Sequence, residues 1–102
     1  EMLALIEHKI TELRKLCKEF DVARMYVFGS ASTGNSTFDS DIDLLISFKD
    51  ISFEKYTDNY FELHEQLELL LEKRVDLITE RSLKNPYFIA SLEDSKKLIY
   101  VA

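Results

Sequence analysis

The sequence lacks the pair of cysteines that an internal disulfide needs and the long apolar run that a membrane span needs. Its 102 residues include a single cysteine, Cys17, which excludes an internal disulfide and suits a reducing cytoplasm. No run of about eighteen apolar residues occurs, so we expect no transmembrane helix and no membrane partner. The N-terminus lacks the succession of basic, apolar and small residues that marks a signal peptide. These absences predict a cytoplasmic protein.

Basic residues are in the minority. Thirteen lysines and arginines stand against nineteen aspartates and glutamates, which gives a formal net charge of −6. Nucleic-acid binding relies on Lys and Arg at the phosphates, so an acidic chain without a basic stripe is a poor candidate for binding a polynucleotide. The composition, 46% apolar and 31% charged, is typical of a globular protein, and residues 1–102 are expected to form one domain.

Hydrophobic periodicity predicts an alternation of helices and strands. Apolar residues at spacings of three and four predict amphipathic helices, and short apolar runs predict strands. The expected elements are helices over 2–19, 52–72 and 87–97, and strands over 22–28, 42–48, 74–79 and 98–101. Cys17 lies on the apolar stripe of the first helix, which favours a small buried residue over a nucleophile. The pattern indicates an α/β fold.

The helix expected over 52–72 carries two features whose roles the sequence leaves open. Its first half is rich in aromatic residues, namely Phe53, Tyr56, Tyr60 and Phe61. Exposed aromatics often mark partner contacts, whereas ordinary core packing is the simpler interpretation. His64 borders the apolar stripe of the same helix. A packed edge residue is the simpler interpretation of this histidine, and a catalytic role is the alternative.

The most informative stretch runs from Gly29 to Asp43. A strand ends at Gly29-Ser30, a short polar loop follows, and Asp41 and Asp43 then lead into an apolar strand. Side chains alternate along a strand, so both aspartates face one way while Ile42 faces the other. At about 5 Å and an effective dielectric near 20, two carboxylates repel by roughly 3 kcal/mol. Such a pair favours a bound cation, and all-oxygen ligation suits Mg²⁺ or Mn²⁺.

The Gly29-Ser30 pair fits the other half of such a site. Glycine lets the backbone approach a ligand closely, and the serine offers a hydroxyl. The amides that follow could open a short helix, whose N-terminus is favourable for an anion. Phosphate on one side and a divalent metal on the other is the chemistry of a nucleoside triphosphate.

A third aspartate, Asp76, interrupts the apolar run 75–79. A charge in such a run is costly unless it is paired or liganded, and a strand-end residue facing water is the structural alternative. Neither Gly-Ser nor Asp-x-Asp is specific alone. Their order along the chain, followed by Val-Asp-Leu, is much more restrictive and favours a functional site.

These motifs resemble the signature of the minimal nucleotidyltransferases of the DNA polymerase beta superfamily. The likeness rests on Gly29-Ser30, on Gly34, on the run 40–45 (Ser-Asp-Ile-Asp-Leu-Leu) and on the run 75–77 (Val-Asp-Leu). It extends over nearly the whole chain, to the segment Asn-Pro-Tyr at 85–87 and the final strand. The resemblance implies a small mixed β-sheet flanked by helices, the nucleotidyltransferase fold.

The resemblance also assigns roles to the site residues. It implies that Asp41 and Asp43 bind two Mg²⁺ or Mn²⁺ ions, and that Asp76 completes the metal site and helps to deprotonate the attacking hydroxyl. It further implies that the triphosphate is held by Gly29, Ser30 and Ser40. One position departs from the pattern. Members often carry Ala-Arg before the second loop glycine, whereas this chain has Ser32-Thr33, which removes a cation near the expected phosphate position.

The implied reaction is metal-dependent transfer of a nucleoside monophosphate, with ATP as the expected donor, to a hydroxyl on a partner protein. Stand-alone members of the resembled family often act as antitoxins of HEPN-domain RNase toxins, so we expect such a partner and a homo- or hetero-oligomer. The alternative is a binding module that masks its partner by contact alone, which the missing cation at Thr33 favours. Nucleotidylation of a small molecule is a third reading, disfavoured because no second domain is present.

Overall fold

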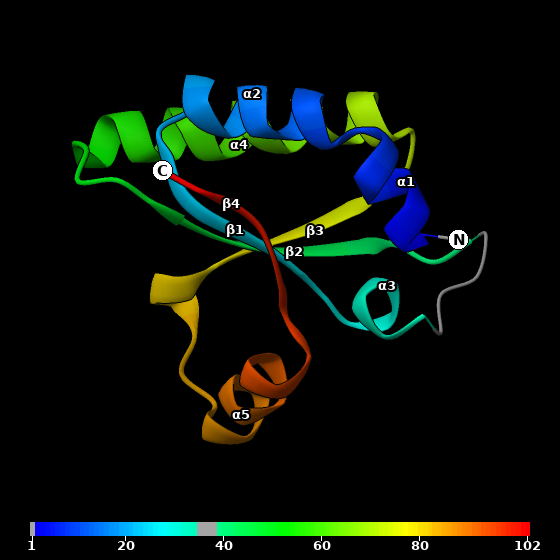
Figure 1. Ribbon diagram of the computed structural model, residues 1–102. Coiled ribbons are helices and arrows are strands. Elements are labelled where there is room, and N and C mark those ends of the chain that lie inside the picture. Colours follow the sequence, from blue (N-terminus) through cyan, green and yellow to red (C-terminus); the bar gives the residue numbers. More distant parts are fainter. Residues whose placement is uncertain (1, 35–38) are drawn as a thin grey trace.

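The computed structural model describes residues 2–34 and 39–102, and it arranges them as a four-stranded sheet with helices on both faces (Figure 1). The helices are α1 (Met2–His8), α2 (Ile10–Glu19), α3 (Ser30–Thr33), α4 (Phe53–Leu71) and α5 (Pro86–Ser95), with a 3₁₀ turn, η1, at Glu80–Ser82. The strands are β1 (Val22–Phe28), β2 (Ile42–Phe48), β3 (Val75–Thr79) and β4 (Lys97–Val101).

The sheet is mixed, as the family resemblance implies. Its strand order is β3-β2-β1-β4, with β1 antiparallel to both β2 and β4, and β2 parallel to β3. Helix α4 forms the crossover between the two parallel strands, which a two-residue turn could not join. The register places Asp43 opposite Phe28 of β1 and beside Asp76 of β3. Two distant parts of the sequence therefore meet at one end of the sheet.

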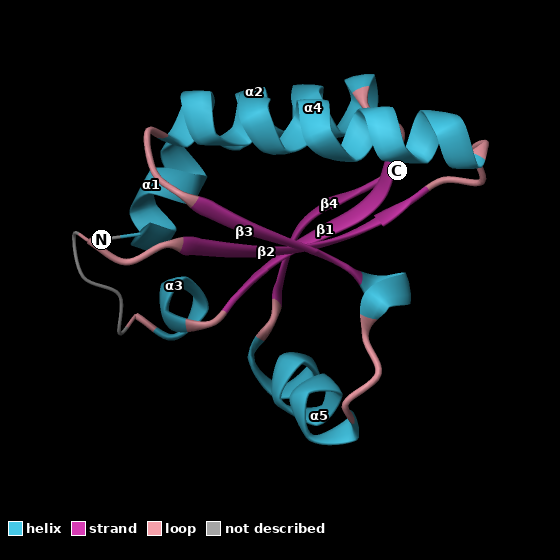
Figure 2. Cartoon of the chain, turned by 180° about the vertical axis from the view of Figure 1, so that it is seen from behind, coloured by secondary structure: helices cyan, strands magenta, loops and turns pink. Residues whose placement is uncertain are grey.

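The two faces of the sheet bury different side chains. Helices α2 and α4 cover one face, and α5 lies against the other (Figures 1 and 2). Leu13 of α2 and Leu67 of α4 are fully buried in the same cluster as Leu44 of β2, and burying each of these side chains contributes about 1.5–3 kcal/mol. A smaller cluster under α5 contains Phe28 and Leu45. Because side chains alternate along β2, Asp43 shares the α5 face with Leu45, while Leu44 faces the main core.

Two predicted helix boundaries are wrong. The helix expected over 2–19 breaks at Lys9, where ψ is 13°, and α1 turns away to pack near α3 while α2 continues over the sheet (Figure 1). The apolar spacing runs through this break, so periodicity alone could not reveal it. The last helix ends at Ser95 instead of residue 97, because Lys97 pairs with Val27 as the first residue of β4.

Helix α4 begins and ends close to where the sequence predicts. Ser52 caps its N-terminus, accepting a hydrogen bond at its Oγ from the Lys55 amide at 3.2 Å. Tyr60 is half-buried and packs against the main core, as the simpler interpretation predicts, and Tyr56 is half-buried against Phe48. Phe53 and Phe61 do not follow this interpretation, because they are 82% and 65% exposed. The helix therefore shows aromatic side chains to solvent on one side.

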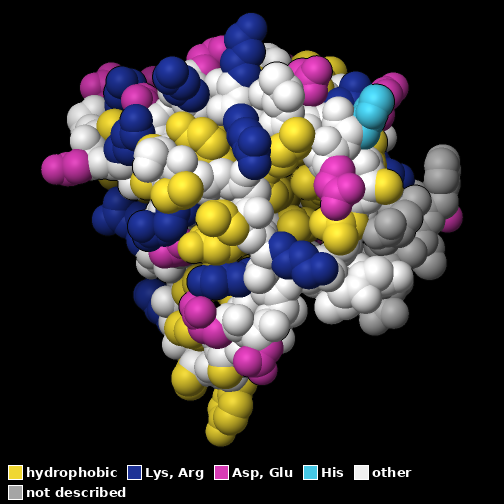
Figure 3. Space-filling model, viewed as in Figure 1, with side chains coloured by type: hydrophobic (Ala, Val, Ile, Leu, Met, Phe, Trp, Pro, Cys, Tyr) yellow, Lys and Arg dark blue, Asp and Glu magenta, His cyan; other side chains and the backbone are white. Residues whose placement is uncertain are grey.

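Charge on the surface is mixed. On the face seen in Figure 3, Lys and Arg side chains lie over α2 and β4, interspersed with hydrophobic and acidic side chains. None of the helices described at 2–34 and 39–102 is both long and apolar enough to cross a membrane.

Cys17 is expected to resist thiol reagents in the folded protein. It is fully buried, and this burial raises the pKa of the thiol to about 12, so almost no reactive thiolate forms at neutral pH. Titration with a chromogenic disulfide reagent at pH 8 should detect no thiol before urea is added and one thiol afterwards. Rapid labelling of the folded chain would contradict the buried assignment.

Candidate active site

Gly29 directly follows β1 and begins the turn into α3. Its φ of 69° and ψ of −149° lie in a region that only glycine adopts readily. A Cβ at this position would overlap Oδ2 of Asp43 and lie 3.3 Å from its Cγ. The missing side chain therefore makes room for the Asp43 carboxylate, in addition to any close approach by a ligand.

The predicted polar loop begins with one helical turn, α3. Ser32 Oγ donates to the Gly29 carbonyl oxygen at 2.9 Å, and Thr33 Oγ1 donates to the Ser30 carbonyl oxygen at 3.3 Å. Ser30 is half-buried, and Thr33 is exposed where the resembled family often has arginine. The turn carries no basic side chain. Residues 35–38 of the predicted loop lie outside the described residues.

The three predicted aspartates lie at this end of the sheet. Asp43 is the second residue of β2 and is half-buried, and Asp76 is the second residue of β3 and is exposed. The two are direct partners in the parallel register. Asp41 is exposed and lies just before β2, preceded by the half-buried Ser40. The fold thus pairs Asp43 with Asp76 and leaves Asp41 two residues before Asp43 at the same end of the sheet.

The carboxylates influence one another electrostatically. Burial raises the pKa of Asp43 above its ordinary range, and the negative charges of Asp76 and Asp41 raise this pKa further. The charged form of the Asp43 carboxylate is therefore disfavoured relative to that of an isolated aspartate. A cation bound at this point would remove that disadvantage.

The donor set fits a divalent cation of the magnesium type. It consists of carboxylate oxygens, and Asp41 lies outside β2, so its side chain can turn toward Asp43 without disturbing the sheet. Across 2–34 and 39–102, no three His, Cys, Asp or Glu side chains already form a cluster that could hold a metal ion. The coordination of a bound metal ion would therefore be completed by rotation of the aspartate side chains and by oxygens of the substrate.

Sequence reasoning missed the part that α4 plays near Asp76. His64 Nε2 lies 2.8 Å from the Val75 carbonyl oxygen, which supports the interpretation of a packed edge residue. Tyr60 donates to the Leu77 carbonyl oxygen, and burial together with the charge of Asp76 raises the pKa of its hydroxyl. The spacing of four between these residues is visible in the sequence. The strand edge that they face is not.

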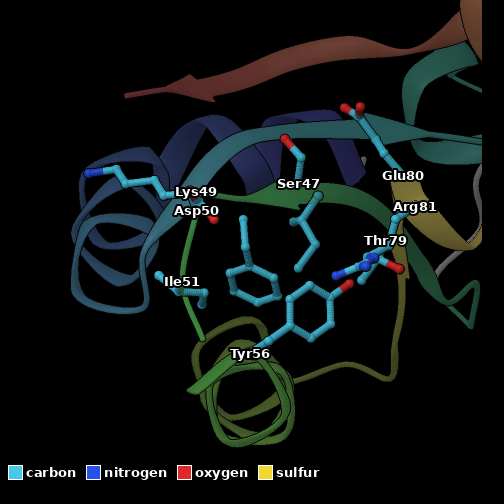
Figure 4. Close-up of a pocket in the computed structure, with 10 residues that line it drawn as sticks. Ser47, Lys49, Asp50, Ile51, Tyr56, Thr79, Glu80 and Arg81 are labelled. Carbon is cyan, nitrogen blue, oxygen red and sulfur yellow. The ribbon is translucent and has the colours of Figure 1, made fainter. Parts of the chain in front are cut away.

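A pocket of about 590 Å³ lies at the other end of β2 and β3 (Figure 4). Ser47 and Tyr56 help to line it, and the Arg81 guanidinium lies 5.1 Å from the centre of the Tyr56 ring. Ser47 is four residues along β2 from Asp43, about 13 Å at the rise of a strand. No predicted site residue lines this pocket, which is separate from the aspartates.

Comparison with known proteins identifies the family. The model of the nucleotidyltransferase domain matches residues 10–99. This chain belongs to the nucleotidyltransferase family. It is 37% identical over 100 residues to a Methanocaldococcus jannaschii protein named as a candidate protein adenylyltransferase, with 97% of each chain covered. It is 43% identical over 82 residues to the protein adenylyltransferase MntA of Thermococcus cleftensis, covering 78% of this chain and 79% of that one.

Solved structures agree on the fold of this nucleotidyltransferase. A protein described as a candidate minimal nucleotidyltransferase superposes with a TM-score of 0.78 at 29% identity, covering 93% of each chain. A toxin–antitoxin complex with AMP-PNP gives a TM-score of 0.71 at 24% identity, covering 91% of this chain and 73% of that one. A tri-AMPylated HEPN toxin of Shewanella oneidensis with its MNT antitoxin gives 0.65 at 21%, covering 94% and 72%. The last two likenesses concern the fold alone.

The family and the site together describe an enzyme of the nucleotidyltransferase type. The structure brings Gly29, Asp43 and Asp76 into one place and leaves Ser30, Ser40 and Asp41 next to them along the chain.

Proposed function

We propose that this nucleotidyltransferase moves AMP from ATP to a hydroxyl group on a partner protein. The observation that carries the proposal is the pairing of Asp43 with Asp76 against the backbone of Gly29. Carboxylates concentrated beside a strand-to-helix turn suit a triphosphate accompanied by divalent metal. The names of the relatives, protein adenylyltransferases, support AMP as the group transferred and a protein as the acceptor.

The reaction that we propose is a displacement at the α-phosphorus of ATP. The acceptor hydroxyl oxygen forms a bond to that phosphorus, the bond to the bridging oxygen breaks, and pyrophosphate leaves with the electron pair. Asp76 helps to remove the hydroxyl proton. Two Mg²⁺ or Mn²⁺ ions, held by Asp41, Asp43 and Asp76, would supply positive charge to the triphosphate. The triphosphate itself would be held by Gly29, Ser30 and Ser40.

The partner that we propose is a HEPN-type toxin in the cytoplasm, bound as a hetero-oligomer. Two structures of similar fold are complexes of an antitoxin with its toxin, and in one of them the HEPN toxin is AMPylated. The net charge of −6 would speed association with a basic protein surface, such as that of an RNase. The same charge disfavours a polynucleotide as the acceptor.

Labelled ATP tests the proposal directly. The protein, Mg²⁺ and a purified candidate toxin would be incubated with ATP labelled on the α-phosphate or, separately, on the γ-phosphate. We expect α-label alone on the toxin, and none with Asp76→Asn, which leaves the strand intact but cannot accept the proton. Asp58→Asn, an exposed aspartate on α4, is the matched control and should transfer AMP normally. Transfer of γ-label would contradict the mechanism, because it would show phosphoryl transfer.

A second candidate function is masking of the toxin by contact alone. The observation in its favour is α3, which carries no basic side chain to bind the phosphates, with Thr33 where arginine is frequent in the resembled family. The same variant, Asp76→Asn, distinguishes an enzyme from a masking protein. If Asp76→Asn still neutralises the toxin in cells as well as the natural chain does, masking accounts for the protection. If neutralisation is lost while binding persists, the transfer of AMP accounts for it.

A further inference from the structure

Strand β3, which carries Asp76, is the outermost strand of the sheet on its side. A strand at an edge has one row of backbone groups that no neighbouring strand can pair, and such strands open easily. In the parallel pair with β2, the inward groups belong to Arg74, Asp76 and Ile78, because Arg74 accepts from the Ile42 amide at 3.0 Å and pairing alternates. The outward groups therefore belong to Val75 and Leu77, the two residues that flank the aspartate.

Helix α4 supplies partners for these outward groups. Tyr60 donates from its hydroxyl to the Leu77 carbonyl oxygen at 2.5 Å. His64 Nε2 lies 2.8 Å from the Val75 carbonyl oxygen, which can only accept, so this nitrogen carries the hydrogen. Glu68 Oε2 accepts from the Val75 amide at 2.8 Å. The three side chains stand four residues apart, so they form one row along the helix that runs over β3 (Figure 2).

We propose that Tyr60, His64 and Glu68, here called the α4 row, are positioning residues for Asp76. They hold the peptide groups on both sides of the aspartate, while β2 holds the peptide group of the aspartate itself. Asp76 thus has a fixed backbone although it sits on an exposed edge strand. The inference rests on the proposed function, since it assigns the row to the carboxylate that would receive the acceptor proton.

The α4 row should affect the rate of AMP transfer, because group transfer tolerates little error in the position of the reacting groups. A misplacement of about 1 Å can cost roughly 100-fold in rate, and loss of a residue that orients a metal ligand commonly costs about 10- to 100-fold. If the α4 row only protected the edge of the sheet, its side chains could pair with any outward backbone groups of β3. The two carbonyl contacts instead fall on the residues immediately before and after Asp76.

Tyr60→Phe removes only the hydroxyl and keeps the ring, which packs edge-to-face with Phe61 at 5.3 Å. We expect kcat for AMP transfer to fall about 10-fold while KM for ATP stays within about twofold, because the hydroxyl orients the aspartate and does not bind the nucleotide. Tyr56→Phe, one turn earlier on the same helix, is the matched control and should match the natural chain. His64→Ala should behave like Tyr60→Phe, and His64→Gln, whose amide can still donate, should recover most of the loss.

Binding of Mn²⁺, followed by electron paramagnetic resonance, gives a readout that does not depend on transfer. Tyr60→Phe should weaken Mn²⁺ binding several-fold in the natural background and not at all when combined with Asp76→Asn. An equal effect in both backgrounds, or natural kcat and Mn²⁺ affinity in both Tyr60→Phe and His64→Ala, would overturn the inference. If the natural chain transfers no AMP, the proposed function fails, whereas the Mn²⁺ cycle still decides whether the row acts through Asp76.

Discussion

Asp43→Asn is expected to stop AMP transfer while making the folded chain more stable. The carboxylate is half-buried beside two others, so removing its charge relieves repulsion and desolvation. After allowance for solvent screening, we expect a gain of about 0.5 to 1 kcal/mol, or a rise in Tm of about 3 to 5 °C. Transfer should fall by at least about 1,000-fold, because a neutral amide would hold the divalent cations needed at the triphosphate much less tightly than the carboxylate does.

The opposite signs of the two effects make this prediction sharp. Thermal unfolding followed by circular dichroism gives Tm, and the α-labelled ATP assay gives the rate. Asp50→Asn, an exposed aspartate in the loop after β2, is the control and should change neither quantity much. A variant that loses activity together with stability would show that Asp43 holds the fold together and would weaken its assignment to the site.

Asp43 should also give the stability of the chain a pH dependence. Folding raises the pKa of Asp43 above its ordinary value of 3.8, so the folded state binds this proton more tightly than the unfolded state does. Its contribution to stability is therefore fully present below the unfolded pKa and is lost as the pH rises through the folded pKa. Urea denaturation of the natural chain and of Asp43→Asn between about pH 4 and 7 should show the gap widening in favour of the variant. A constant gap would contradict the raised pKa.

Gly29→Ala is expected to destabilise the folded chain more than alanine at its other glycine, Gly34, would. The backbone conformation at Gly29 costs a residue with a side chain roughly 1 to 3 kcal/mol, and the new Cβ would also displace the Asp43 carboxylate. We expect a loss of about 3 kcal/mol in the free energy of unfolding. AMP transfer should be lost as well, because one of the proposed metal ligands must move.

Gly34→Ala provides the matched control. Gly34 has a φ of 79° and caps the C-terminus of α3. Apart from its chain neighbours, no residue in the described ranges 2–34 and 39–102 has an atom within 4 Å of the Cβ that alanine would add. Only the backbone term applies, so the loss should be about 1 kcal/mol. The double variant Gly29→Ala/Asp43→Ala should recover the part of the loss that comes from the overlap. Equal losses at the two glycines would show that contact with Asp43 does not constrain position 29.

The strands were predictable because polar residues mark their ends. The run 22–28 stops at Gly29, and the run 42–48 starts after Asp41, so both bounds agree with the structure residue for residue. The break at Lys9 was not predictable, because the apolar spacing continues through it even though α1 turns to pack near α3. The local sequence indicates helix propensity, whereas the direction of a helix depends on its tertiary contacts.

Some features of the candidate site were likewise predictable from the sequence, and others were not. The gathering of Asp41, Asp43 and Asp76 follows from alternation within strands and from the family resemblance. The contact of Gly29 with Asp43 depends on the antiparallel register that sets Phe28 opposite Asp43, and no feature of the sequence states that register. The α4 row escaped prediction because it exists only if β3 is an edge strand. Strand order is a property of the whole sheet.

The alternation of side chains along β2 and β3 has a consequence for how such a protein can evolve. Leu44, Val75 and Leu77 face the main core, whereas Asp43 and Asp76 face the other way. Residues of the candidate site and residues of the main core thus lie on opposite sides of one sheet. Mutations that retune the chemistry can accumulate on one face without opening cavities in the other. A lineage built on this sheet can therefore acquire new acceptors while the side chains of its main core stay the same.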